Sequence, residues 1–161
     1  MLWIKFIITG ELILGRVINP EPPGKERKRL AKSIVVALRM LSQQTEINNE
    51  TRDMTAFIAL ALNAITKTID KTVEPWEKRG YWVKADRFRM EWTWTEKLGK
   101  ILHDSLAKED WSTVAITTAS ISEKLSTVNV SQRHRLGTPW VGAWEKFTVG
   151  GSGDGKPRRS Y

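Results

Sequence analysis

Residues 49–72 read NETRDMTAFIALALNAITKTIDKT, and the spacing of their apolar residues predicts the fold class. Apolar side chains recur every three or four positions, which aligns them along one face of an α-helix. These positions are Met54, Phe57, Ile58, Ala61, Ile65 and Ile69. Asn48 or Asn49 is suited to cap the start of that helix, and Glu50 and Asp53 lie in its first turn, where the helix dipole favours acids. We therefore predict a long amphipathic helix that ends with this stretch.

Further helices are predicted on both sides. Residues 25–44 have the same spacing at Leu30, Ile34, Leu38 and Leu41. A third helix is expected to open at Thr72, with Pro75 in its first turn, where a missing N–H is harmless. Its pattern pauses at Gly80 and resumes through Val83, Phe88, Trp92, Leu98, Ile101 and Leu102. Asp110 can cap a fourth helix that holds Val114, Ala115, Ile121 and Leu125. The fold class predicted from these patterns is all-α, a bundle of four to five helices.

The two ends of the chain differ from this bundle. Residues 1–24 form an apolar segment followed by a proline-rich linker, and residues 1–18 could be a hairpin or, as we favour, helix. The segment contains charged residues and has no run long enough to span a membrane. The bundle domain is expected over residues 25–147. Residues 148–161 are predicted to be a flexible Gly-rich basic tail at the end of an irregular C-terminal segment.

Composition narrows the function classes. The chain has 161 residues, and 26 Lys and Arg against 18 Asp and Glu give a net charge of +8, which favours a polyanionic partner, nucleic acid before an anionic membrane. With no cysteine, a disulfide scaffold, a thiolate metal site and a cysteine nucleophile are excluded. Two histidines leave little room for a histidine-built metal site. We therefore predict a non-enzymatic protein without a metal or other cofactor.

Three clusters of cations are the candidate binding residues. The first lies in the opening turn of a predicted helix, where the dipole disfavours cations unless an anion binds there. The second interleaves cations with aromatics, as in grooves that follow a nucleic-acid backbone and stack bases. The third follows the fourth helix and precedes the tryptophans Trp140 and Trp144. We expect that segment to pack on its own bundle or on a neighbouring subunit. The residues are Lys25, Arg27, Lys28, Arg29 and Lys32, then Lys78, Arg79, Lys84, Arg87 and Arg89, and finally Arg133 and Arg135.

A second, weaker sequence pattern, formed by pairs of acidic residues, is typical of one class of enzyme. Glu50 and Asp53, like Glu74 and Glu77, are carboxylate pairs at helical spacing, and helical nucleotide pyrophosphohydrolases hold magnesium with such pairs. Here the pairs stand in the reverse order to the arrangement usual in those enzymes, and the first pair sits where a helix start attracts acids anyway. The chain has no phosphate-binding glycine loop and no nucleophile motif. A small Mg-dependent nucleotide hydrolase is therefore a minor alternative.

The predicted bundle resembles the small subunits of type I CRISPR effector complexes, type I-D among them. The resemblance covers residues 25–147 and rests on size, helix number, positive charge and the abrupt apolar start Met1-Leu-Trp-Ile4. It implies a subunit, translated separately from within a large-subunit gene, that does no chemistry. Copies of such a subunit pack along the complex and hold target and displaced DNA strands with a positive surface.

The predicted function follows from both arguments. We expect a cytoplasmic subunit of a nucleoprotein complex that contacts nucleic-acid backbone without reading sequence, and whose affinity falls steeply with salt. Its partners would be single-stranded DNA or a guide RNA duplex, other subunits and further copies of itself, with no membrane. The alternative from a different class is a protein-interaction adaptor whose basic faces meet an acidic partner.

Overall fold

The computed structural model describes residues 21–151, and in that part of the chain it contains five helices and no strand. The all-α class predicted from the sequence is therefore confirmed. The helices are α2 (Pro23–Leu41), α3 (Asn49–Lys78), α4 (Trp82–Ala107), α5 (Trp111–Lys124) and α6 (Ala143–Gly151). The expectations for residues 1–18 and for the last ten residues of the tail lie outside the described residues.

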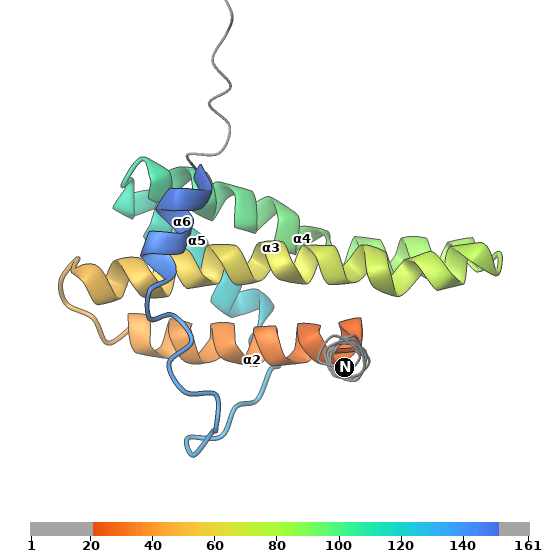
Figure 1. Ribbon diagram of the computed structural model, residues 1–161, viewed down its shortest axis with the longest axis horizontal. Coiled ribbons are helices and arrows are strands. Elements are labelled where there is room, and N and C mark those ends of the chain that lie inside the picture. The colour runs from red at the N-terminus through yellow and green to blue at the C-terminus, as the bar shows by residue number, and fades with distance from the viewer. Residues whose placement is uncertain (1–20, 152–161) are drawn as a thin grey trace, which may run out of the picture.

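Helix α3 is the central element of the bundle. Its 30 residues span about 45 Å, and it contacts α2, α4 and α6 (Figure 1). Helix α4 folds back along α3, and α5 packs against α4 and α2. The α3–α4 hairpin is longer than α2, so its closed end runs past the first turn of α2 (Figure 1). That end of the molecule holds two of the three predicted cation clusters.

The core lies where these helices meet. Its largest fully buried side chains come from α2, α3, α4 and α5 and are Ile34, Met54, Ile58, Leu62, Ile65, Leu102, Leu106 and Ile121. Gly99 of α4 lies against Leu62 of α3, and a Cβ added at Gly99 would sit 3.3 Å from the Leu62 Cβ. The two long helices therefore approach closely at this level.

The predicted caps are present. The Asn48 side chain accepts a hydrogen bond from the Thr51 N–H at 2.9 Å, and the Thr51 hydroxyl faces back toward the Asn48 N–H, which forms a capping box. Asp110 accepts from the N–H and the hydroxyl of Thr113 at 3.2 and 2.6 Å. These bonds lower the pKa of Asp110 from its ordinary value.

The predicted start of the third helix at Thr72 was wrong. Helix α3 continues through Pro75 to Lys78, and the chain turns only at Gly80, whose φ is +81°. A proline inside a helix removes one backbone hydrogen bond, but near the end of a helix few backbone hydrogen bonds remain to be disturbed. The last turns are instead held by tertiary packing. Val73 is fully buried, and Trp76 contacts Phe88 edge to face with 5.4 Å between the ring centroids.

Two predicted limits of helical structure also differ from the structure. Helix α2 begins at Pro23 rather than Lys25, because a proline at the first helical position already has a helical φ. The C-terminal segment was expected to be irregular, but it contains α6, which crosses the predicted boundary at residue 147. A helix as short as α6 is unstable by itself and is held by the rest of the bundle. Its local sequence pattern is therefore a weak predictor of the helix.

Some positions predicted to be apolar core are on the surface. Val83 is 73% exposed and Ile101 45% exposed, and Ala115 is exposed as well. Helix α4 packs on α3 and α5 through a face that includes Ala85, Thr95 and Leu102, and Val83 and Ile101 point away from it. Within residues 21–151, none of the helices combines the length and the hydropathy required to cross a membrane.

Candidate nucleic-acid interface

The first cluster forms an exposed cationic face at the start of α2. Lys25, Lys28, Arg29 and Lys32 are all exposed and, at spacings of three, four and seven residues, lie on one side of the helix. Leu30 and Ile34 bury the other side against the bundle. Arg29 is partly engaged, since its Nε lies 3.2 Å from an oxygen of Glu21. The lysines Lys25, Lys28 and Lys32 are therefore the most open cations of α2.

Arg27 does not belong to that face, so its assignment as an open binding residue is corrected. Its guanidinium points into the bundle and donates to the Thr72 hydroxyl at 3.1 Å. The Cζ atom also lies 4.8 Å from the ring centre of Phe88 and 5.3 Å from that of Trp92. Burial lowers the pKa of Arg27 from its ordinary value, partly offset by the charge of Glu91. One turn of α2 thus carries a packing arginine among surface lysines.

The contacts of Arg27 bring the first two clusters together. Because the side chain reaches Phe88 and Trp92, the first turns of α2 lie beside the first half of α4. The second cluster begins at Lys78 and continues through the turn into the same part of α4. The start of α2 and the closed end of the α3–α4 hairpin therefore lie toward the same end of the molecule, with the hairpin extending beyond α2 (Figure 1).

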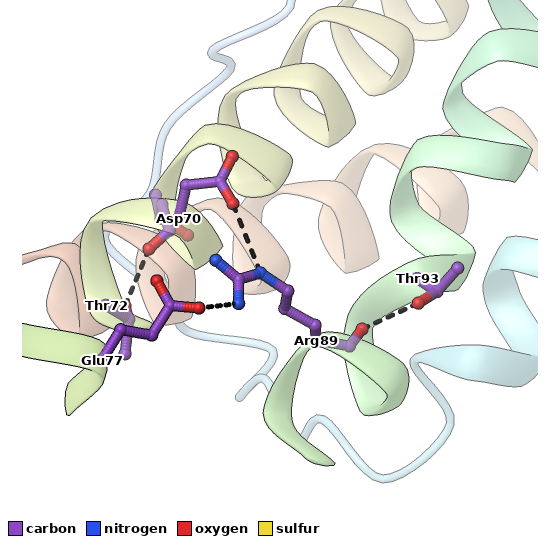
Figure 2. A network of polar contacts seen from close by, with 6 residues as sticks. Asp70, Thr72, Glu77, Arg89 and Thr93 are labelled. Atoms are coloured by element: carbon purple, nitrogen blue, oxygen red, sulfur yellow. Dashed lines mark hydrogen bonds and ion pairs between the residues drawn. The ribbon is translucent and has the colours of Figure 1, made fainter. Parts of the chain in front are cut away.

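Within the second cluster, Arg89 has a structural role rather than an open one. Its guanidinium bonds to Glu77 and lies 3.8 Å from a carboxylate oxygen of Asp70, so it joins α4 to α3 (Figure 2). The hydrogen bond from Arg89 lowers the pKa of Glu77, and the same bond raises the pKa of Arg89. Arg89 is therefore a less open cation than the other members of the second cluster, because both acids already pair with it.

The other cations of the hairpin differ in how open they are. Lys78 pairs with Glu74 at 2.7 Å within α3, an exposed pair that contributes little energy. The ammonium of Lys84 lies 4.1 Å from the ring centre of Trp76 but remains exposed. Arg79 and Arg87 are exposed and form no ion pair within residues 21–151. Within the second cluster, Arg79, Lys84 and Arg87 are therefore the exposed cations without an ion pair among residues 21–151.

The closed end of the hairpin also exposes aromatic rings, which are not among the binding residues predicted from the sequence. Tyr81 is 56% exposed and Trp82 59% exposed. An open hollow of about 420 Å³ lies there, lined by Gly80, Tyr81, Trp82, Val83, Lys84 and Arg87. The sequence pattern shows that aromatics and cations alternate here, but their exposure depends on where the turn falls.

The third cluster lies apart from the other two. Arg133 and Arg135 are exposed on the segment between α5 and α6. That segment runs beside the end of α2, because Arg39 donates to the carbonyl of Val130 at 3.1 Å. Trp140 in this segment is buried, so the segment packs on its own bundle. Arg39 follows Lys25 by 14 residues, so about 21 Å of helix separates the end of α2 beside the third cluster from the start of the first cluster.

The four acids of the hydrolase alternative are not gathered into one site. Asp53 accepts from the backbone N–H groups of Gly142 and Trp144 at 3.1 and 2.9 Å and so caps α6. Glu74 and Glu77 pair with Lys78 and Arg89, as described above. Among residues 21–151, no three histidine, aspartate or glutamate side chains are grouped as a metal would require.

The arrangement of exposed cations can hold an anion. Open lysines on α2 and open cations on the hairpin share one end of the bundle, together with exposed Tyr81 and Trp82. Comparison with protein-family models, with curated proteins and with solved structures finds no match to the chain.

Proposed function

We propose that the chain is a non-enzymatic subunit of a nucleoprotein complex that binds nucleic-acid backbone without reading sequence. The observation that supports this is the grouping of open cations from α2 and from the α3–α4 hairpin at one end of the bundle. Phosphates bound there would gain from side-chain charge. The type of complex proposed is the cytoplasmic CRISPR effector that the sequence resembles, in which the subunit also packs on its neighbours.

The test is binding of a labelled 30-mer single strand, followed by fluorescence anisotropy at several salt concentrations. Affinity should fall steeply with salt and be similar for unrelated sequences. The double variant Lys28→Glu with Lys32→Glu should weaken binding to every sequence and reduce the log–log salt slope by about one to two units.

The matched control is Lys108→Glu with Lys146→Glu, which changes net charge equally but away from the hairpin's closed end. It should bind almost as the wild type does. Equal losses from both double variants would show that only net charge matters, and the interface would be wrong. If the wild type bound no strand even at low salt, the basic faces would serve an acidic protein partner instead, as in an interaction adaptor.

A further inference from the structure

The closed end of the α3–α4 hairpin exposes aromatic surface that the fold does not use. Residues 21–151 hold seven tryptophans, and among them only Trp82 is exposed, at 59%; the other six are buried or half-buried. Its neighbour Tyr81 is 56% exposed, and as the N-cap residue of α4 it makes no capping hydrogen bond through its side chain. With Val83, which is 73% exposed, the two rings form contiguous apolar surface, and contiguous apolar surface is what marks an interaction site.

Other residues do the packing at this end of the hairpin. Trp76 and Phe88 contact each other across the two helices, Ala85 is fully buried, and Arg89 bonds to Glu77 (Figure 2). The turn itself is made by the backbone, with Gly80 at φ +81° and the Tyr81 N–H donating to the Trp76 carbonyl at 2.9 Å. Removing the side chain of Trp82 should therefore leave the fold intact.

The chemistry of the hollow at this end suits one kind of occupant. Its lining combines the two rings with the cations Lys84 and Arg87 and includes no acidic side chain. Flat rings stack on a nucleobase, and cations at the same site attract the phosphates on either side of it. A base within a duplex is already covered on both faces by its neighbours, so only an unpaired base can stack on a protein side chain.

We infer that this hollow binds an unpaired nucleobase, stacked on Trp82 with Tyr81 beside it, so that the interface prefers single strands to duplex. This inference rests on the proposed function, since it names which form of nucleic acid that interface takes. Backbone contact by the lysines of α2 gives no preference for single strands, since duplex has the higher charge density. The aromatic end of the hairpin supplies the selectivity.

The test compares three probes of equal phosphate number: an oligo-dT strand, a blunt hairpin duplex and a strand of abasic deoxyribose phosphates. The wild type should bind oligo-dT more tightly than the other two. Trp82→Ala should weaken binding to oligo-dT about tenfold or more, change the other two little, and leave the salt slope unaltered. Trp82→Phe, which keeps a ring, should recover most of the loss.

The matched control is Ile116→Ala, which removes another exposed apolar side chain, 69% exposed, from α5. It should bind all three probes as the wild type does, and circular dichroism should show every variant folded. If the wild type binds oligo-dT and Trp82→Ala leaves that binding unchanged, base stacking is overturned while the proposed function stands. No salt-dependent binding to any probe would overturn both, and Trp82-dependent binding to anionic vesicles alone would make the hairpin a membrane-contacting surface.

Discussion

At the residue scale, cations of the same type have different roles because their neighbours differ. Arg27 and Lys28 are adjacent in sequence, yet Arg27 faces two hydroxyls and two aromatic rings whereas Lys28 is exposed. An arginine can make such a contact because its planar guanidinium stacks on rings while its N–H groups donate in plane. The count of cations in a cluster therefore overstates the number available to bind phosphate.

Arg27→Ala should destabilise the fold and leave nucleic-acid binding nearly intact. The substitution removes a hydrogen bond and two cation–π contacts, so we expect the free energy of unfolding to fall by about 1–2 kcal/mol. Lys28→Ala should do the opposite, with unchanged stability and weaker binding. Urea denaturation and anisotropy on the same two variants measure both quantities. A loss of affinity for Arg27→Ala in a folded protein would restore this residue to the interface.

Asp110 should make stability depend on acidity. Its pKa is lowered in the folded protein by hydrogen bonds from Thr113, so its contribution is complete above about pH 4 and is lost as pH falls through the lower, folded-state pKa. Asp110→Asn keeps a capping oxygen but cannot titrate in this range. The stability difference between wild type and variant, from urea denaturation at pH 7 and pH 2, should therefore shift in favour of the variant in acid. A difference that does not change with pH would contradict this account.

At the element scale, the ends of the helices depend on partners from elsewhere in the chain. Asp53 lies in the second turn of α3 and caps α6, 89 and 91 residues further along. The last turns of α3 continue past Pro75 because they pack on α4. Neither contact has a local sequence pattern, since each joins residues distant in the chain.

Asp53→Ala should release α6 while the rest of the bundle stays folded. A helix of nine residues is unstable alone, and removal of its cap costs about 1 kcal/mol. We expect faster hydrogen exchange at residues 143–151, with the Trp144 N–H most affected, and little change in α3 and α4. Glu50→Ala, one turn earlier in α3 and exposed, is the matched control and should leave α6 protected. Equal protection of α6 in both variants would show that side-chain packing alone holds it.

At the scale of the whole molecule, α3 is the part on which the other helices depend. The cores of α2 and α4 meet on it, and the close approach at Gly99 and Leu62 joins the two longest helices. The hairpin end beyond α2 has fewer neighbours, so it can carry exposed aromatics and cations without weakening the core (Figure 1).

Leu62→Ala should destabilise the whole bundle. Leu62 is fully buried, so the cavity left behind should cost about 3 kcal/mol, with one cooperative transition by circular dichroism and by tryptophan fluorescence. Val83→Ala, at a position predicted from its spacing to be core but 73% exposed, should change stability by less than about 0.5 kcal/mol. If Leu62→Ala lost only one of the two signals early, the helices would be unfolding separately.

The helical class, the spacing of the core residues in α2 and α3 and the caps at Asn48 and Asp110 could be predicted from the sequence, because these depend on residues within a few positions of one another. The sequence also showed where cations concentrate. The continuation of α3 through Pro75, the hold of Asp53 on α6, the inward position of Arg27, the pairing of Arg89 with Glu77 and the exposure of Trp82 all depend on tertiary contacts. Each of these depends on which distant element lies against the residue, and that is decided by the packing of the whole bundle.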